Sequence, residues 1–519
     1  MNFDIPQNVI PDMMSHHARH FPNKIALVMG DQRVTWGEMN RSINRIANRL
    51  LEDGIERGDK VAFVLRTSLE YFYLLFGAMK AGASAVPLST MLSAEQVSVL
   101  LNDAGAKMVF TDAENAHLVR AQGGELHTVR SDGFFTIKSL EGWRSMPAWL
   151  GDVGDGEPPV RLMMDDEATI SYSSGTTGFP KGIVYSHRAR QHLAIGYAGH
   201  MHIDGAAVGV ATTPLYSNGT SIIMFPTLMW GGTLVFMESF DAGKFLELVE
   251  RERATHTFMV PTQFVKLMAH SDFGHRDISS MKIFLSAGSP MLPDLKREVM
   301  EKLGGRLSEL YGLSEGGAAM IRPDELVSRP LSTGRPLPGF EFRIIGADDG
   351  ELKRGEVGEI VCYGGWAMRC YHNRLEQTES AIWRDEQGRS FVRTGDIGKL
   401  DEDGYLFVVD RKKDMIISGG FNVFPADIEA IVGGHPAVES VAVIGVPHPV
   451  WGESPLALVV LKSGENVDPE DLRNWANTRV AKTQRIAAVV VREDFPRNAL
   501  GKIQKSELRD EYREFKLGS

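Results

Sequence analysis

The chain has 519 residues, of which 43% are hydrophobic and 24% charged, and its formal net charge is -11. This length is too great for one core and predicts roughly two to four folding units. The acidic balance argues against nucleic acid as the main partner, because phosphate backbones are bound by basic surfaces.

Cysteine content and the N-terminal sequence limit the class further. Only two cysteines occur, Cys362 and Cys370, and no further residues of a zinc site accompany them. The N-terminus has neither a basic start nor a long apolar stretch. We therefore expect a cytoplasmic protein without a transmembrane helix or other integral membrane segment.

From 34 to 110 the sequence alternates helical and strand patterns. Thr35 followed by Glu38 forms a capping box, and apolar residues continue from it at helical spacing to Gly54. We expect strands at 61–65, 85–88 and 108–110, with helices between them at 68–81 and after Ser93. Such alternation predicts a parallel sheet covered by helices.

The later parts of the chain predict three further units. Strands at 233–236 and 257–260 flank a helix at 245–253, which indicates a second α/β subdomain. From 334 to 410 short strands alternate with Gly and Asp turns and no helix is expected, as in a small β barrel. Beyond it, strands at 438–445, 456–461 and 489–491 and a helix at 471–480 predict a small α+β unit.

The fold class that follows is α/β. We expect a large multi-subdomain N-terminal domain over residues 1–412, with two α/β subdomains and the small barrel. A small α+β C-terminal domain follows over residues 413–519.

The stretch SYSSGTTGFPKGIVYSH, residues 171–187, has the composition of a phosphate-binding loop. It is not the loop of a P-loop NTPase, because Pro180 before Lys181 has no N–H and Gly182 after it has no hydroxyl for magnesium. Its hydroxyls and glycines still suit an anion, although such a segment alone is also typical of an ordinary polar turn.

Four further stretches carry side chains suited to nucleotide chemistry. ELYGLSEGG places Tyr311, which can stack on a base, near Glu315, which can hold magnesium. RTGD places Asp396 after a glycine turn, where its carboxylate can accept both ribose hydroxyls. DRKKDMIISGGFNVFP carries Arg411, and PRNALGKIQ carries Lys502. Each alone is compatible with a core aromatic or a solvated charge, but together they indicate a nucleotide site.

In this order and spacing the segments resemble the core motifs of the adenylate-forming superfamily, which contains acyl-CoA synthetases, peptide-synthetase adenylation domains and firefly luciferase. The similarity extends from about residue 21 to residue 503, and SGGFNVFPADIE is closest to fatty-acyl and aryl CoA ligases. The resemblance implies an acid:CoA ligase. Carboxylate and MgATP would give acyl-AMP and pyrophosphate, and CoA would then displace AMP.

The resemblance also implies a role for particular residues. Lys181 and Lys502 would be catalytic, with Lys502 between the carboxylate and the α-phosphate. Glu315 and Thr176 would hold Mg²⁺. The contacts to ATP and AMP would come from Ser173, Ser174, Gly175, Thr176, Thr177, Gly178, Gly288, Ser289, Tyr311, Gly312, Ser314, Asp396 and Arg411. The acyl pocket would be lined by Tyr216, Ser217, Asn218 and Gly219.

The family further implies that the small C-terminal domain rotates between the two half-reactions. Lys413, two residues after Arg411, is the expected hinge. One orientation would deliver Lys502. The other would bring Ser418, Gly419 and Gly420 to the channel for CoA, where glycine permits close approach of the thiol arm.

Two features leave the substrate and the acceptor open. Ser217 stands where many fatty-acyl and aryl ligases have a histidine, so the gate between ATP and acyl pocket is altered. No acid follows the pattern that holds an amino group, which favours an apolar acid of undefined chain length or ring structure. An acyl-AMP ligase that loads a carrier protein and a non-catalytic acyl or nucleotide sensor are the alternatives, and a homodimer also stays open.

Overall fold

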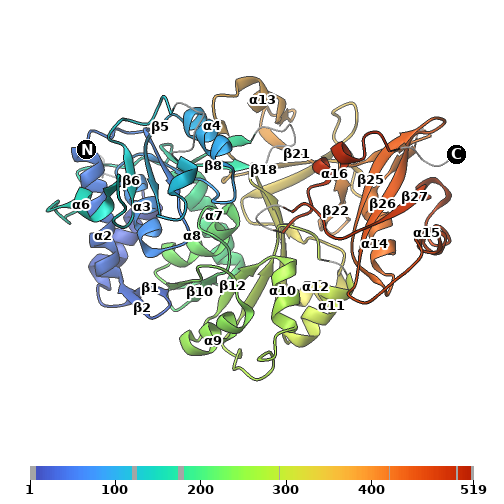
Figure 1. Cartoon of the computed structure of the whole chain (residues 1–519), viewed down its shortest axis with the longest axis horizontal. Coiled ribbons are helices and arrows are strands. Elements are labelled where there is room, and N and C mark those ends of the chain that lie inside the picture. The colour runs from blue at the N-terminus through green and yellow to red at the C-terminus, as the bar shows by residue number, and fades with distance from the viewer. Residues whose placement is uncertain are drawn as a thin grey trace.

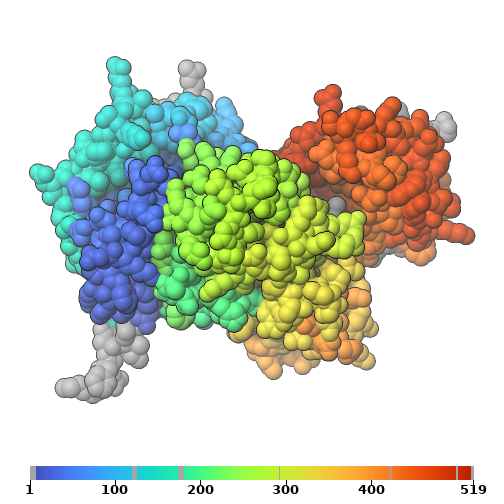
Figure 2. Space-filling view, turned by 90° about the horizontal axis from the view of Figure 1, so that it is seen from below, coloured from blue at the N-terminus to red at the C-terminus, as the bar shows by residue number. Residues whose placement is uncertain are grey.

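The computed structural model describes residues 7–119, 126–173, 180–291, 293–419, 421–497 and 501–515. Within this part of the chain the strands form four sheets. Three of them belong to the larger N-terminal portion, and the fourth belongs to a smaller unit at the C-terminal end (Figure 1). Figure 2 shows this C-terminal unit as a separate lobe.

The first α/β subdomain contains an eight-stranded sheet of order β19-β9-β8-β4-β3-β5-β6-β7. β3 pairs in parallel with β4 and β5, whereas β8 and β9 form an antiparallel hairpin. The strands are β3 (Lys60–Val64), β4 (Ser84–Pro87), β5 (Ala106–Thr111), β6 (Phe134–Thr136), β7 (Arg144–Ser145), β8 (Glu167–Ser173), β9 (Lys181–Ser186) and β19 (Cys370–Tyr371). The α/β pattern predicted for 34–110 is confirmed, including the capping boxes at Thr35 and Ser93.

The second subdomain contains a nine-stranded sheet of order β16-β15-β14-β13-β12-β10-β11-β1-β2. Its central strands β10, β12, β13 and β14 run parallel to one another. The strands are β1 (Ile25–Met29), β2 (Gln32–Thr35), β10 (Val208–Ala211), β11 (Thr233–Phe236), β12 (His256–Met259), β13 (Ile283–Ser286), β14 (Leu307–Leu313), β15 (Gly316–Ile321) and β16 (Arg335–Pro336). The carboxyl ends of the parallel strands β10, β12, β13 and β14 lie at the same edge of the sheet.

Helices cover both sheets and join them around a common core (Figure 1). The helices are α1 (Ile10–His20), α2 (Trp36–Glu52), α3 (Leu69–Lys80), α4 (Ala94–Ala104), α5 (Ala116–Val119), α6 (Met146–Leu150), α7 (His187–Met201), α8 (Ser221–Met229), α9 (Ala242–Glu252), α10 (Pro261–Met268), α11 (Pro293–Lys302) and α12 (Pro323–Ser328). A 3-10 turn η1 (Asn218–Thr220) precedes α8. One buried cluster contains Phe63 from the first sheet and Leu234 from the second. None of the helices in the described ranges combines the length and the apolar character needed to cross a bilayer.

The region from 334 to 410 forms an open antiparallel half-barrel, in agreement with the expected short strands. It consists of β17 (Phe340–Ile345), β18 (Gly358–Gly364), β20 (Ile382–Arg384), β21 (Ser390–Leu400) and β22 (Leu406–Arg411). The expectation that helices are absent was wrong, because α13 (Leu375–Ser380) lies within it. None of the residues of α13 is buried, so it carries no apolar periodicity.

The C-terminal unit has the predicted α+β composition. Its sheet has the order β24-β23-β26-β25, and β27 adds in parallel to β26. The elements are β23 (Ile416–Ser418), β24 (Phe421–Val423), α14 (Pro425–Gly433), β25 (Val438–His448), β26 (Gly452–Leu461), α15 (Pro469–Asn477), η2 (Lys482–Gln484), β27 (Ala488–Arg492) and α16 (Lys505–Glu511).

Candidate active site

The residues expected around the base meet at the carboxyl ends of β13 and β14. These parallel strands pair Ser286 with Glu309, and Gly288 and Tyr311 each follow this pair by two residues. Gly288 is exposed and has a φ of 92°, which lets a flat ring approach the backbone. Ser289 is half-buried and Gly312 is exposed, so both border an open site. Ligands bind at this edge in α/β sheets generally.

The β8–β9 hairpin holds the two ends of the phosphate loop. Ser173 is opposite Lys181 in the last pair of the hairpin. The other expected loop ligands, Ser174, Gly175, Thr176, Thr177 and Gly178, lie outside the described residues. The Lys181 ammonium lies 4.7 Å from the centroid of the Tyr371 ring, a cation–π contact that holds it at the base of the loop.

Tyr371 connects Lys181 to the expected metal ligand. Its hydroxyl donates to Glu315 Oε1 over 2.8 Å. Tyr371 reaches this place because β19 pairs with β9, with Tyr371 opposite Ile183. Sequence reasoning missed Tyr371, since no motif or periodicity marks a pairing between segments so far apart. Within the described residues Glu315 Oε2 accepts no hydrogen bond, and it can therefore serve as a metal ligand.

Asp396 is the centre of the expected ribose site. It is 4% exposed, and its two oxygens have different partners. Oδ2 accepts from the Tyr311 hydroxyl over 2.7 Å, and Oδ1 lies 3.1 Å from Arg411 Nε. Burial, followed by the charge of Asp396, raises the pKa of Tyr311 well above its usual value, so this hydroxyl stays a donor. Each carboxylate oxygen keeps a lone pair for a ribose hydroxyl.

Lys502 comes to this site from the C-terminal unit. It is half-buried, and the neighbouring Gly501 lies against α10, where a Cβ would come 3.4 Å from Thr262 Oγ1. The pKa of Lys502 is lowered to about 8, chiefly by burial and then by the charge of Arg411, whereas Asp396 and Asp414 act in the opposite direction. Lys502 is therefore near enough to Arg411 and Asp396, the proposed ribose residues, for their charges to interact.

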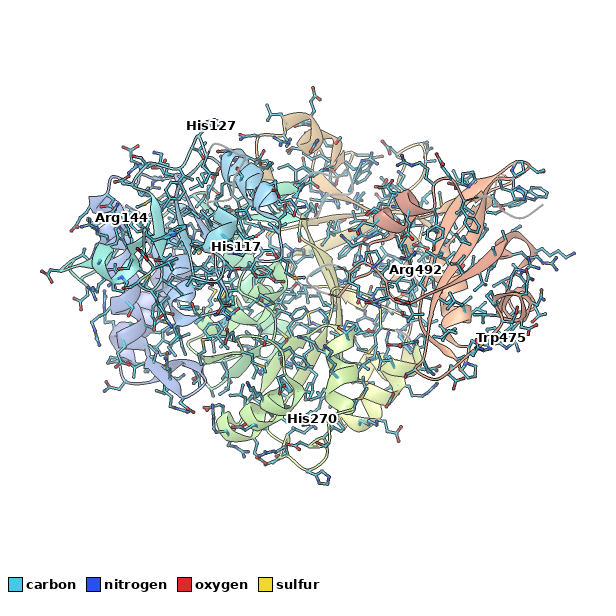
Figure 3. The ribbon with its side chains drawn as sticks, viewed as in Figure 1. His117, His127, Arg144, His270, Trp475 and Arg492 are labelled. Atoms are coloured by element: carbon cyan, nitrogen blue, oxygen red, sulfur yellow. The ribbon has the colours of Figure 1, made fainter. Side chains whose placement is uncertain are left out.

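The segment that carries Lys502 is fixed at both ends. Arg492 of β27, labelled in Figure 3, donates to Glu511 Oε1 over 2.6 Å and to the Tyr512 hydroxyl over 2.9 Å. These contacts tie β27 to the end of α16. Arg497 Nη1 also donates to the Gly501 carbonyl over 3.0 Å, which closes the turn beside Lys502.

The expected acyl-pocket residues lie between the two sheets. Tyr216, Ser217 and Asn218 line one cavity, and the Ser217 hydroxyl accepts from the Gly219 backbone N–H over 3.2 Å. Gly219 is required by close packing, because a Cβ there would come 2.8 Å from the Phe258 ring.

Tyr185 joins this pocket to the motif that contains Ser314. Asn218 Nδ2 donates to the Tyr185 hydroxyl over 3.2 Å, and that hydroxyl donates to the Ser314 carbonyl over 2.5 Å. Arg190 Nη1 donates to Asn218 Oδ1 over 2.9 Å. Sequence reasoning named neither Tyr185 nor Arg190 as a site residue.

The residues expected to bind CoA are not part of this cluster. Ser418 pairs with Phe421 and Gly452 in the C-terminal sheet, and the Gly419 N–H donates to the Trp451 carbonyl over 2.8 Å. Gly420 lies outside the described residues.

Lys413 lies in the turn between β22 and β23 and is exposed. Its two neighbours are held from opposite sides. Lys412 Nζ lies 2.9 Å from Glu359 of the half-barrel, and Asp414 Oδ1 lies 2.5 Å from Arg509 of α16. The expected hinge is thus flanked by one ion pair to each unit.

Asp410, in β22, makes a further contact across this turn. Its Oδ2 accepts the backbone N–H of Ala426 over 2.9 Å. Ala426 is in the first turn of α14, whose N-cap residue Phe424 provides no side-chain cap. The cap of α14 therefore comes from the other side of the expected hinge.

Comparison with known proteins assigns both parts of the chain. The model of the AMP-binding enzyme family matches residues 14–372, and that of the AMP-binding enzyme C-terminal domain matches residues 427–502. The chain is 34% identical over 484 residues to long-chain-fatty-acid–CoA ligase FadD13 of Mycobacterium tuberculosis, covering 93% of this chain and 94% of that protein. It is 33% identical over 497 residues to a feruloyl-CoA synthase of Amycolatopsis sp., covering 95% and 96%. The crystal structure of ATP-bound MatB from Rhodopseudomonas palustris has a TM-score of 0.88 and 29% identity, covering 97% of this chain and 99% of that one.

Proposed function

The chain belongs to the AMP-binding enzyme family, among its AMP-forming acyl-CoA ligases, and on this premise we propose that it joins a carboxylic acid to CoA in two steps. The acid attacks the α-phosphate of ATP, which gives acyl-AMP and releases pyrophosphate. The thiol of CoA then attacks the acyl carbon and releases AMP. The observation that carries this proposal is the convergence of Tyr311 and Arg411 on the buried carboxylate of Asp396, with Lys502 of the C-terminal unit near enough for its charge to interact with Asp396 and Arg411.

Lys502 acts in the first step. Negative charge accumulates on the α-phosphate oxygens as the carboxylate attacks, and a positioned ammonium stabilises that charge more than it stabilises the separate substrates. Asp396 orients the ribose, and Arg411 and Tyr311 fix the two oxygens of Asp396 in place. The position of Gly501 against α10, where an added Cβ would lie 3.4 Å from Thr262 Oγ1, supports this assignment.

The residues also fit a magnesium ion. Mg²⁺ is bound in such enzymes through one or two carboxylates together with substrate phosphates. Glu315 is half-exposed and has Oε2 available within the described residues, while Tyr371 orients Oε1. When bound, the ion would neutralise the phosphate charge of ATP. Lys181, held over the Tyr371 ring, adds a second cation on the same side.

The second step requires the C-terminal unit to reorient. We place the boundary at residues 1–412 and 413–519, with Lys413 as the hinge. The ion pairs of Lys412 with Glu359 and of Asp414 with Arg509 support this, because they attach the two sides of Lys413 to different units. Rotation would then bring Ser418, Gly419 and Gly420 to the CoA channel.

The acid in this proposal has an apolar part. The lining of the cavity at Tyr216 to Asn218 includes the apolar side chains of Leu75, Met224 and Phe225. Apolar surface buried there contributes to binding of the acid. Thr169, Ser171 and Arg190 contribute polar groups to the same lining.

Acid-dependent exchange of pyrophosphate into ATP tests the function. A panel should run from short-chain through long-chain to aromatic and polycyclic acids, followed by addition of CoA or of a carrier protein with its thiol arm. We expect exchange with at least one acid and release of free acyl-CoA. Acylation of the carrier protein without acyl-CoA would favour an acyl-AMP ligase. Absence of acid-dependent exchange across the panel would favour a non-catalytic sensor and overturn the proposal.

A further inference from the structure

The acyl pocket contains a buried cation without an acidic partner. Arg190, in the first turn of α7, is 3% exposed and lines the same cavity as Ser217 and Asn218. Its Nε and Nη2 donate to Thr169 Oγ1 over 3.0 and 2.6 Å, and its Nη1 donates to Asn218 Oδ1 over 2.9 Å. All these acceptors are neutral. Within the described residues Arg190 forms no ion pair with a carboxylate.

The hydrogen-bonding capacity of Arg190 is not exhausted. A guanidinium has five N–H groups. One N–H of Nη1 has no acceptor within the described ranges, and Nη2 reaches Ser171 Oγ only at 3.5 Å. Arg190, which lines the cavity, therefore keeps an N–H for which the described residues supply no acceptor.

The surroundings of Arg190 compensate its charge only in part. The guanidinium lies 3.8 Å from the centroid of the Tyr185 ring and 5.3 Å from that of Phe225. Burial lowers the pKa of Arg190 to about 10, which leaves it charged at neutral pH. A buried cation with only neutral partners is unfavourable, and a carboxylate that binds it through two parallel hydrogen bonds is its best partner.

The shape of the cavity limits the size of the group that enters it. Its volume is about 20 Å³, which is space for little more than one water molecule. The polar residues that line the cavity are Thr169, Ser171, Arg190, Ser217, Asn218 and Ser221. A compact polar group at the end of a short acid suits this space better than a long alkyl chain.

We propose that Arg190 binds a second carboxylate of the acid substrate, so that the enzyme activates short dicarboxylic acids in preference to monocarboxylic acids of the same length. The inference rests on the proposed ligase function and names the substrate class of the same site. It replaces the expectation of a purely apolar acid. The remote carboxylate meets Arg190, while the reacting carboxylate meets Lys502.

A matched comparison of substrates tests the proposal. Pyrophosphate exchange is measured with pairs that differ only in the second carboxylate, butanoate against succinate and hexanoate against adipate. We expect kcat/KM to favour the dicarboxylate by about tenfold or more, as for a hydrogen-bonded charge pair. Arg190→Met should abolish this preference, and Arg190→Lys should retain part of it. Arg188→Met is the matched control, because Arg188 is exposed on the same helix and pairs with Asp165 at 2.9 Å.

A second variant changes the charge without removing the arginine. Ser171→Asp would place a carboxylate beside Arg190 Nη2, and it should shift the preference toward monocarboxylic acids. Thermal melting of each variant shows whether it is folded.

Binding separates failure of this inference from failure of the ligase function. Calorimetry with succinate or adipate, in the presence of α,β-methylene-ATP, should show binding to the wild type and at least tenfold weaker binding to Arg190→Met, roughly the value of one charged hydrogen bond. Dicarboxylate binding without exchange would support the inference and reject the ligase function. Equal or better use of monocarboxylates by the wild type would overturn the inference, and so would the absence of both binding and exchange with dicarboxylates. The inference would also be overturned if Arg190→Met lowered kcat/KM equally for all acids and raised the KM for ATP. Arg190 would then act only through Asn218 and Tyr185.

Discussion

Arg411 and Arg190 lie at the proposed nucleotide end and the proposed acyl end of the site, and they differ in what the protein places beside them. Arg411 is half-buried and lies 3.1 Å from the carboxylate of Asp396. Arg190 is more deeply buried, yet its hydrogen bonds go to Thr169 and Asn218. Each arginine is accompanied by a tyrosine, Tyr311 through Asp396 and Tyr185 through its ring.

The difference follows the chemistry of the two ligands. A ribose presents hydroxyl donors, so the protein supplies the carboxylate that accepts from them, and Arg411 serves to hold that carboxylate. At the proposed acyl end the protein supplies the cation alone, and in our proposal the substrate supplies the anion. A substitution at the proposed nucleotide end should therefore leave the preference among acids unchanged, and a substitution at the proposed acyl end should leave the affinity for ATP unchanged.

The largest expected effect comes from removing the charge that acts between the two ends. Lys502→Ala should slow acyl-AMP formation about 100- to 1,000-fold, the usual cost of losing one group that stabilises developing negative charge. Given synthetic acyl-AMP and CoA, it should still form thioester at a substantial rate. Rapid-quench assays of each half-reaction measure this. Lys482→Ala, an exposed lysine in the same unit, is the control, and equal loss of both half-reactions in Lys502→Ala would contradict a separate role for Lys502.

Breaking the nucleotide end alone should change the affinity for ATP. Asp396→Asn removes the negative charge that Arg411 and Tyr311 hold, and we expect the KM for ATP to rise roughly 10- to 100-fold, as for a hydrogen bond to a charged group. The ratio of kcat/KM for succinate over butanoate should not change. Steady-state kinetics with both acids provides the measurement, and a changed ratio would show that the two ends are not independent.

The pH dependence should also belong to the first half-reaction alone. The pKa of Lys502 is lowered to about 8 by burial, so the ammonium is present at lower pH and is lost as the pH rises through this value. The kcat/KM for acyl-AMP formation should be level below about pH 7 and fall about tenfold per unit above pH 8. Thioester formation from acyl-AMP should not show this fall. If kcat/KM for acyl-AMP formation stayed constant up to pH 10, the reaction would not depend on the protonated ammonium of Lys502.

The smallest effect is expected at the residue that joins the two ends. Tyr185→Phe removes the hydroxyl between Asn218 and the Ser314 carbonyl, and a net loss of about 1 kcal/mol corresponds to roughly fivefold in kcat/KM. A double-mutant cycle with Arg190→Met measures the coupling. Additive effects would show that the hydrogen-bond chain from Arg190 to Ser314 carries no energy between the ends.

The features predicted correctly from the sequence are those encoded locally. The capping box at Thr35 lies within a few residues, and the structure confirms it together with the helix that it begins. The motif around Tyr311 is equally local, but its role at a nucleotide stays a prediction; the structure adds the hydrogen bond from Tyr311 to Asp396. Tyr371 was missed because its position depends on the pairing of β19 with β9. The short helix α13 was missed because it buries no residue and therefore has no apolar face.

Arg190 shows why a sequence motif alone could not identify this site. Arg188 and Arg190 stand two positions apart in SHRAR, and on a helix such residues point about 200° apart. The fold turns Arg188 toward Asp165 at the surface and Arg190 toward Thr169 in the interior. Only the packing of α7 against β8 distinguishes the surface arginine from the buried one.

The cap that Asp410 provides for α14 bears on which arrangement the resting enzyme occupies. If the C-terminal unit rotates about Lys413, the N–H of Ala426 leaves Asp410, and α14 has no side-chain cap of its own to replace it. Loss of a helix cap costs about 0.5–2 kcal/mol, which corresponds to a population ratio of roughly 2 to 30 in favour of the arrangement described here. Before any substrate binds, most molecules would then already have Lys502 beside Asp396, and acyl-AMP formation would require no prior reorientation.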